Sequence, residues 1–251
     1  ISDWAQEERL LSPESSASPG RWDNARAPHT VMPSDYMSPS SPTEKVVLKF
    51  SAQSGKTEIL LNVLGFYAAE MPGPILVVQP NQKPMSEEFS KNRVTPMFRD
   101  TPALASLLTD EGGRKHSTNP ILSKQFPGGT LSMIGANSPS SLASRPIRVL
   151  LCDEIDRYVA TKEGDALALA TKRTRTFSNR KILVASTPTF EEMGVYREYE
   201  QCERQYVWQL RCLGCDEYSY PQLENFLWDD RDASSARLVC HECGYIHEHH
   251  E

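Results

Sequence analysis

The stretch KVVLKFSAQSGKT, from Lys45 to Thr57, constrains the fold of this chain more than any other part of its sequence. An apolar segment of strand length runs into a loop of small residues ending in Gly55, Lys56 and Thr57, and an amphipathic helical segment follows. Such a loop can bind a polyphosphate, because N–H groups of the loop and of the helix N-terminus surround the anion. Lys56 would neutralise the outer phosphates, and the Thr57 hydroxyl can hold Mg²⁺. The stretch predicts a nucleoside triphosphate site.

The loop departs from the complete phosphate-binding pattern at its first position. That position is normally glycine, and Phe50 occupies it here. A short GKT match also occurs by chance, so a lysine-bearing turn before an ordinary helix remains an alternative. Within the loop, Gln53 and Ser54 precede the glycine and are candidate nucleotide contacts, although Gln53 can equally cap the turn.

A second segment, IRVLLCDE at residues 147–154, is an apolar strand that ends in two adjacent acids. A strand buried on both faces is a nearly continuous hydrophobic run, and ligands bind at the carboxyl ends of parallel strands. Asp153 is then positioned to hold Mg²⁺, and Glu154 to activate the water that attacks the γ-phosphate. The alternative is a strand followed by two solvated acids.

Strand-like and helix-like segments alternate from residue 45 onward. We expect strands at residues 46–50, 74–79, 121–126, 130–134, 147–154 and 180–186, and helices at 56–69, 84–97, 165–177 and 195–204. Strand, helix and strand at this spacing imply crossover connections and a mainly parallel sheet. The Pro-Gly-Gly sequence between the third and fourth strands predicts a hairpin or strand pair.

Composition limits the class of protein. With 251 residues, 39% of them hydrophobic, the chain can bury one full core and a small appendage. Its apolar runs are strand-sized and its start lacks a secretory profile, so we expect no membrane span and a cytosolic protein. A net charge of -6 argues against a uniformly basic nucleic-acid coat, but it leaves room for a local basic stripe.

Four of the six cysteines form two C-x-x-C pairs, Cys212 with Cys215 and Cys240 with Cys243, with 24 residues between the pairs. In an intracellular chain, this clustering indicates metal binding rather than a disulfide framework. Four thiolates suit tetrahedral Zn²⁺ in a closed, structural site, and reduced free thiols are the alternative. The histidines that follow are either accessory ligands or a polar tail: His241, His247, His249 and His250.

Three motifs, SAQSGKT, LLCDEIDRY and VASTPT, precede the cysteine pairs in this order. Together they resemble the ATPase domain of bacteriophage terminase large subunits of the GpA kind. The opening SDWAQEERLLSPESSASPGRW and the stretch GPILVVQPNQKPMSEEFSKNRVTPMFRDTPAL look similar to that family as well. The resemblance implies an α/β fold of the RecA-like, P-loop ASCE class, with a central, mostly parallel sheet flanked by helices and a small C-terminal zinc ribbon.

On this reading the chain divides into three parts. Residues 1–44 are a Ser- and Pro-rich arm laid over the core or partly disordered, with a short helix near residues 3–11. Residues 45–205 form the P-loop ATPase core, and residues 206–251 the zinc-ribbon extension. The resemblance further implies an endonuclease whose acidic cluster lies beyond Glu251.

The resemblance also implies a motor that hydrolyses ATP to move double-stranded DNA into a procapsid. Its expected partners are the terminase small subunit and the capsid portal, and its active form is a homo-oligomeric ring. It would work in the host cytoplasm, docked on the procapsid, without a membrane. Two rivals remain: a helicase-like nucleic-acid-dependent ATPase, and a weakly hydrolysing module that docks the portal or small subunit.

Site residues carry over from the family motifs position by position. Gly55, Lys56 and Thr57 match the phosphate loop, Asp153 the metal-linked acid and Glu154 the catalytic glutamate. The motif thought to couple nucleotide state to movement matches Ser186, Thr187 and Pro188.

Two further positions concern positive charge at the transferred phosphate. Residues 52–53 are Ala and Gln where many terminases carry an arginine, so the loop itself supplies none. Arg145 resembles the position of an arginine that acts in trans from a neighbouring subunit. A surface salt bridge or a DNA contact is the alternative for Arg145, and Arg148 is a rival for the role.

Overall fold

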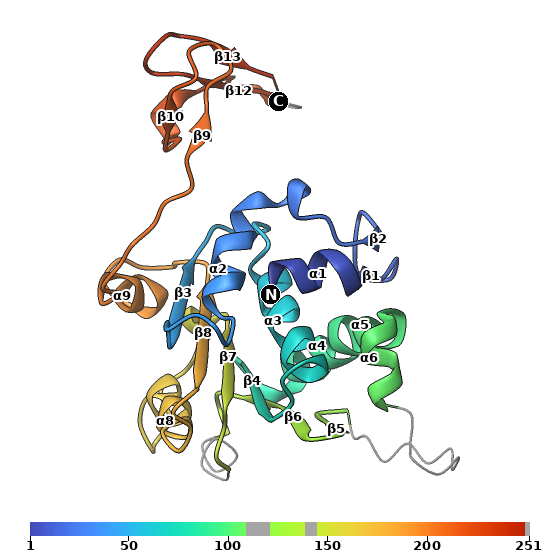
Figure 1. Cartoon of the computed structure of the whole chain (residues 1–251). Coiled ribbons are helices and arrows are strands. Elements are labelled where there is room, and N and C mark those ends of the chain that lie inside the picture. The colour runs from blue at the N-terminus through green and yellow to red at the C-terminus, as the bar shows by residue number, and fades with distance from the viewer. Residues whose placement is uncertain (109–120, 139–144, 249–251) are drawn as a thin grey trace. The chain divides into compact units, whose positions relative to one another are not determined.

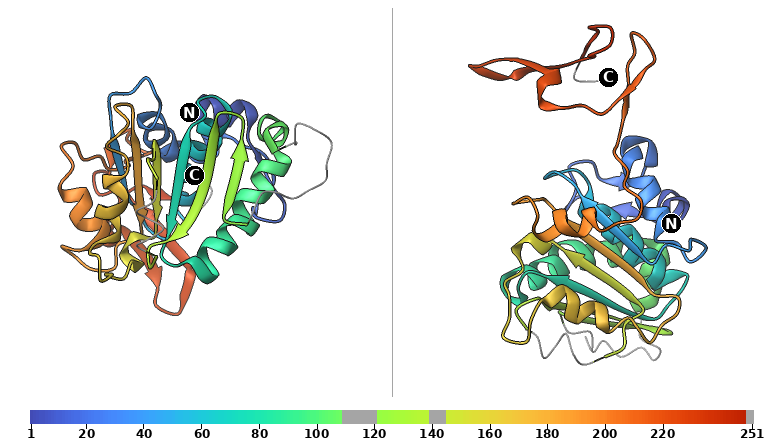
Figure 2. Two further views of the ribbon diagram at one scale, coloured as in Figure 1. Left: turned by 90° about the horizontal axis from the view of Figure 1, so that it is seen from below. Right: turned by 90° about the vertical axis from the view of Figure 1, so that its left-hand side faces the viewer.

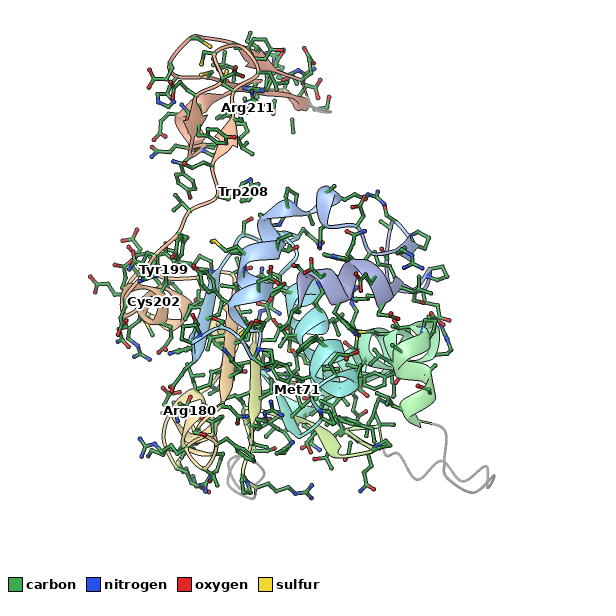
Figure 3. All side chains as sticks on the ribbon, viewed as in Figure 1. Met71, Arg180, Tyr199, Cys202, Trp208 and Arg211 are labelled. Carbon is green, nitrogen blue, oxygen red and sulfur yellow. The ribbon has the colours of Figure 1, made fainter. Side chains whose placement is uncertain are left out.

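The computed structural model describes residues 1–108, 121–138 and 145–248. The chain forms two compact units, Ile1–Cys202 and Glu203–Glu251 (Figure 1). Cys202 ends the first unit, and Trp208 follows it in the connecting segment (Figure 3).

The first unit is built on a six-stranded sheet with the order β3-β8-β7-β4-β6-β5. Its strands are β3 (Lys45–Lys49), β4 (Pro74–Gln79), β5 (Ser123–Phe126), β6 (Gly129–Gly135), β7 (Val149–Asp153) and β8 (Lys181–Ser186). All neighbouring pairs are parallel except β5 with β6, which form the expected antiparallel hairpin. The predicted mainly parallel α/β sheet is confirmed.

The strand order brings the predicted motifs together. β8 lies between β3, which leads into the phosphate loop, and β7, which ends in the acidic pair. The parallel register aligns Lys49 with Ser186, and Asp153 with Ala185. Because parallel strands share one carboxyl edge, the loop after β3, the acids after β7 and the segment after β8 emerge side by side.

Burial on both faces explains the apolar strands. All five residues of β7 are buried. Val149 and Leu151 belong to one hydrophobic cluster. Leu150 and Cys152 belong to a second cluster on the other face, as the two-residue period of a strand requires.

Helices cover both faces of the sheet (Figure 2). The first cluster includes residues of, or next to, α1 (Ser2–Glu8), α2 (Val31–Tyr36), α3 (Lys56–Ala69), α4 (Glu87–Phe89), α5 (Thr95–Asp100) and α6 (Pro102–Ala105). The second cluster includes residues of α8 (Ala166–Lys172) and α9 (Gly194–Glu200). α9 also contacts the edge strand β3.

The N-terminal segment is part of the core rather than an arm laid over it. Trp4 and Trp22 are buried, and the Tyr67 hydroxyl donates a 2.8 Å hydrogen bond to the Met37 carbonyl. A Cβ placed on Gly65 of α3 would lie 2.5 Å from the Trp4 ring, so only glycine permits this contact. The segment also contains a two-stranded ribbon of β1 (Leu10–Leu11) and β2 (Gly20–Arg21).

Several helices are shorter than their sequence patterns predict. The segment expected as one helix at residues 84–97 is divided among π-helical turns at Gln82–Ser86 and Ser90–Val94 and the short helices α4 and α5. The helix expected to reach residue 177 ends at Lys172, where Thr174 Oγ1 donates to the Thr171 carbonyl (2.8 Å). Such bonds compete with helix continuation.

The second unit is a small ribbon of short antiparallel strands. They are β9 (Leu210–Arg211) with β10 (Tyr218–Ser219), and β11 (Phe226–Asp229), β12 (Asp232–Val239) and β13 (Ile246–His247). Among its described residues, only Cys212 and Cys240 are buried. Within residues 1–108, 121–138 and 145–248, none of the helices has the length and apolar character needed to cross a membrane.

Candidate functional site

The phosphate loop connects β3 to α3 and has left-handed backbone at two positions. Gln53 has φ 61° and Gly55, which precedes the first residue of α3, has φ 85°. Phe50 is not among the residues with positive φ. The loop therefore needs no glycine at its first position, which explains how Phe50 is accommodated.

Lys56 joins the phosphate loop to the segment after β8. Its side chain is only 6% exposed, and Nζ donates to the Ser51 carbonyl at 2.7 Å and to Thr187 Oγ1 at 2.8 Å. The Phe50 N–H donates to the Ser186 carbonyl at 3.3 Å. Ser186 is fully buried, Thr187 is half-buried and Pro188 is exposed. The structure thus brings the predicted coupling motif into direct contact with the lysine.

Asp153 is a buried carboxyl with an incomplete set of partners. Its Oδ2 accepts a hydrogen bond from Gln79 Nε2 (3.0 Å), whereas Oδ1 is buried without a hydrogen-bond partner among the described residues. Burial raises the pKa of Asp153 above its ordinary value, the charge of Glu154 raises it further, and the charge of Lys56 lowers it. An unsatisfied buried carboxylate oxygen in this position suits a cation such as Mg²⁺.

Glu154 has an unusual backbone. It adopts a left-handed conformation, φ 52° and ψ 47°, and its side chain is half-buried. This conformation is uncommon for residues other than glycine and is concentrated at functional sites. It directs the chain from the end of β7 into the turn Ile155–Arg157.

The two arginines before β7 lie away from these residues. Arg145 is exposed, and both arginines precede the first residue of β7, whereas Asp153 is its last. Arg148 is buried, and its guanidinium group donates a 3.1 Å hydrogen bond to the carbonyl of Met71, which Figure 3 labels. The same group lies over the Tyr67 ring. Arg148 therefore supports the start of β4.

The four clustered cysteines of the ribbon converge. Their sulfur atoms all lie within 4.8 Å of one another, with 3.7 Å between Cys212 and Cys243 and 3.8 Å between Cys215 and Cys240. Zn–S bonds of about 2.3 Å in a regular tetrahedron require S···S edges of about 3.8 Å. The spacing therefore fits one Zn²⁺.

The two C-x-x-C turns share one backbone design. The Cys212 N–H donates to the Glu217 carbonyl and the Cys240 N–H to the Tyr245 carbonyl, both at 2.8 Å. Asp216 and Gly244, each following the second cysteine of its pair, have φ 65° and 74°. His241 pairs with Glu242 and His247 contacts the Tyr245 ring, while His249 and His250 lie outside the described residues.

Comparison with known proteins decides the family. A family model described as phage terminase large subunit gpA, ATPase domain, matches residues 16–251. This chain belongs to that family. The terminase ATPase domain is 26% identical over 253 residues to the terminase large subunit of Enterobacteria phage P21. That match covers 97% of this chain and 39% of the relative, so the chain spans well under half of the curated relative's length.

A solved structure supports the fold independently. The large terminase of bacteriophage HK97 matches with a TM-score of 0.56 and 13% identity, over 78% of this chain and 38% of that one. At this identity the likeness concerns the fold. The terminase ATPase family also implies ATP hydrolysis for this domain.

The candidate nucleotide site contains residues that the motifs did not single out. Asp156 accepts hydrogen bonds from the N–H groups of Thr189 (2.8 Å) and Val195 (2.7 Å), and its own N–H donates to Ser186 Oγ (3.2 Å). It thereby ties the acidic turn to the segment after β8 and to α9. Its position two residues after Glu154 was the only sequence signal.

Gln79 and His29 also contact residues of the candidate nucleotide site. Gln79 is the last residue of β4, and its side chain donates a hydrogen bond to Asp153. His29 contacts the phosphate loop through the Ser54 carbonyl. Nothing in the sequence pattern of residues 26–31 indicates this contact.

Proposed function

We propose that this domain hydrolyses ATP to move double-stranded DNA into a procapsid. The observation that carries the proposal is the convergence of three segments at one sheet edge. Lys56 bonds to Thr187, and its charge acts on Asp153, which is 97 positions further along the chain. A cation, a base and phosphate-binding N–H groups at one edge are the parts that phosphoryl transfer requires.

The proposed roles follow from position. Gln53, Ser54, Gly55, Lys56 and Thr57 bind the triphosphate of ATP. Thr57 and Asp153 hold Mg²⁺, which when bound neutralises charge on the phosphates. Glu154 orients the attacking water and accepts its proton, and Lys56 stabilises charge on the transferred phosphate. Arg145 of one subunit completes the site of its neighbour in a homo-oligomeric ring.

Coupling would run from Lys56 to α9. The Lys56 ammonium group has three N–H donors, and one of them is bonded to Thr187. When Lys56 turns toward a phosphate, the contact with Thr187 changes. Ser186, Thr187 and Pro188 then transmit the nucleotide state through the hydrogen bonds of Asp156 to the start of α9.

The ribbon is proposed to be a structural zinc module. Its four thiolates leave no open position for water on the metal, which argues against catalysis there. Residues 203–251 contain 4 arginines, no lysine and 10 acidic residues. Their net charge is therefore -6, the same as the net charge of the whole chain. DNA phosphates would be repelled by such a unit, so we assign DNA contact to residues 1–202.

The remaining roles belong to the parent protein. We propose that it docks on the procapsid portal in the host cytoplasm, with a terminase small subunit as partner. Its endonuclease would lie outside this stretch, because the chain spans 39% of the length of the phage P21 relative.

Phosphate release and MgATP affinity test the proposal on the 251-residue chain. Lys56→Ala should lose MgATP binding, and Glu154→Gln should bind MgATP but hydrolyse it at least about 100-fold more slowly. Circular dichroism controls for folding. Wild-type turnover in both folded variants would refute the assigned roles, and strand unwinding without a procapsid would favour a helicase instead.

A further inference from the structure

Two adjacent residues of the N-terminal segment, His29 and Thr30, contact the phosphate loop. Both lie in a short 3-10 helix, Pro28–Thr30. His29 Nε2 is 3.0 Å from the carbonyl oxygen of Ser54. A carbonyl oxygen can only accept a hydrogen bond, so Nε2 carries the hydrogen and the imidazole donates.

This hydrogen bond fixes the direction of one loop N–H. In a planar trans peptide, the Ser54 carbonyl and the Gly55 N–H point in opposite directions. Holding the carbonyl toward His29 therefore turns the Gly55 N–H away from His29. Over residues 1–108, 121–138 and 145–248, the backbone N–H groups of Ser54, Gly55 and Lys56 have no hydrogen-bond partner. Unpartnered N–H groups at a helix N-terminus are the donors that bind phosphate.

The imidazole is held in place by packing. Its ring centroid lies 6.1 Å from that of Phe50, with the planes tilted by 50°. Thr30 is only 1% exposed, and its Cγ2 would lie 3.2 Å from a Cβ added to Gly55. The loop therefore rests on this part of the N-terminal segment through apolar contacts as well as the hydrogen bond.

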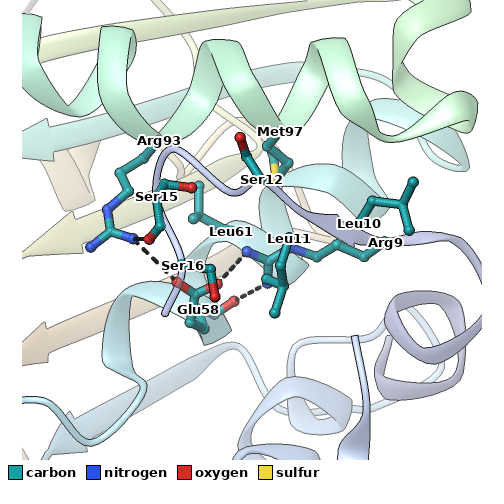
Figure 4. A pocket seen from close by; sticks show the side chains of 10 residues that line it. All are labelled: Arg9, Leu10, Leu11, Ser12, Ser15, Ser16, Glu58, Leu61, Arg93 and Met97. Atoms are coloured by element: carbon teal, nitrogen blue, oxygen red, sulfur yellow. Dashed lines mark hydrogen bonds and ion pairs between the residues drawn. The ribbon is translucent and has the colours of Figure 1, made fainter. Parts of the chain in front are cut away.

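A second attachment holds the first turn of α3 (Figure 4). Arg9, 2% exposed, forms an ion pair with the Glu58 carboxylate and donates to the Glu58 carbonyl at 3.1 Å. Arg93 lies 3.6 Å from the other carboxylate oxygen. Glu58 directly follows Thr57, so the N-terminal segment also holds the start of the helix into which the phosphate loop leads.

We propose that His29 is a positioning residue of the nucleotide site. Its Nε2–H holds the Ser54–Gly55 peptide in the orientation that offers the Gly55 N–H to the phosphates of bound ATP. The inference rests on the proposed ATPase function. Because the phosphate contact exists both in the bound ground state and in the transition state, its loss raises KM and leaves kcat at saturation nearly unchanged.

Three variants of the full 251-residue chain, with MgATP as the probe, test the role of the donor. His29→Phe keeps a ring beside Phe50 without a donor. His29→Gln keeps a donor, and His29→Met matches glutamine in length without one. We expect MgATP affinity to fall about fivefold to tenfold in His29→Phe and His29→Met, and less than about threefold in His29→Gln. The KM values should follow the same order, with kcat within about twofold of wild type.

The outcomes separate this inference from the function on which it rests. If wild-type protein and all three variants bind MgATP equally well, His29 does not position the loop, while the proposed function stands. Equal losses in His29→Gln and His29→Met would also overturn the inference, because the donor would then be irrelevant. This comparison of equal-length side chains remains decisive if His29→Phe does not fold. Failure of the wild-type chain to bind MgATP would overturn the proposed function itself.

Discussion

Asp153 and Asp156 lie three residues apart in the sequence, but their carboxyl groups have opposite environments. Asp153 is buried and Asp156 is half-buried. One oxygen of Asp153 has no hydrogen-bond partner in the part of the chain that the structure describes, and burial raises the pKa of this carboxyl. Asp156 accepts two backbone hydrogen bonds, one on each oxygen. The charge of Asp153 therefore destabilises the nucleotide-free protein, whereas the carboxylate of Asp156 stabilises it.

This contrast predicts opposite effects of two matched substitutions. Asp153→Asn should raise the free energy of unfolding at pH 7 by about 1 kcal/mol, because it removes a poorly solvated charge. Asp156→Asn should lower it by about 1–3 kcal/mol, because an amide offers only one acceptor oxygen. Denaturant titration measures both, and destabilisation of similar size in the two variants would contradict the account.

The raised pKa of Asp153 also predicts a pH dependence. When the pKa of a carboxyl group is higher in the folded protein than in the unfolded protein, the group contributes its full stabilisation only below its unfolded pKa. This contribution is lost as pH rises through the folded pKa. The stability advantage of Asp153→Asn over wild type should therefore be present at pH 7 and shrink toward pH 4. Thermal unfolding of both proteins across this range tests the sign, and an advantage that grows at pH 4 would exclude it.

At the level of helices and strands, the sequence predicted the strands better than the helices. Strands buried on both faces, such as β4 and β8, are nearly continuous apolar runs. The positions where each apolar run begins and ends therefore mark the ends of the strand. The helices at residues 82–100 and 166–172 depend on π-helical turns and on threonine side chains that bond back to the backbone. Such local competition is not visible in hydrophobic periodicity.

From its Ser- and Pro-rich composition, the N-terminal segment is expected to be an arm laid over the core or partly disordered. Its burial depends on tertiary contacts with α3, and Gly65 makes room for Trp4 in a way that no local pattern reveals. The nucleotide motifs, by contrast, needed only strand ends and loop chemistry. The terminase family that they indicated is confirmed by the family model, whereas the roles assigned to single residues remain predictions.

A pair of tryptophan substitutions tests whether the N-terminal segment belongs to the core. Trp4 is 7% exposed in the core, and Trp228 is 49% exposed in the ribbon. Trp4→Ala should cost about 3–5 kcal/mol of stability in the first unit, and Trp228→Ala much less. Denaturant unfolding followed by circular dichroism measures both, and a negligible cost for Trp4→Ala would mean that the segment is only loosely attached.

At the level of the whole molecule, the two units have different sources of stability. The first has two hydrophobic clusters around a sheet, whereas the described residues of the ribbon bury little besides Cys212 and Cys240. A unit with so small a core depends on metal for its fold. The ribbon should therefore unfold without zinc while the first unit stays intact.

Metal removal tests this division. We expect one zinc per chain by elemental analysis, lost in Cys240→Ser but retained in Cys202→Ser, since Cys202 lies outside the cluster. Chelation should disorder the ribbon, and MgATP affinity should change by less than about twofold if the site lies within the first unit. Absence of zinc from purified protein, or loss of MgATP binding on chelation, would contradict the proposal.

The most direct test of the central claim is a crystal structure with Mg²⁺ and a non-hydrolysable ATP analogue. We predict that the Lys56 ammonium contacts the terminal phosphates, that Mg²⁺ lies between Thr57 and Asp153, and that Glu154 faces the γ-phosphate. A triphosphate bound elsewhere, with Lys56 still bonded to Ser51 and Thr187 and no metal at Asp153, would contradict the account.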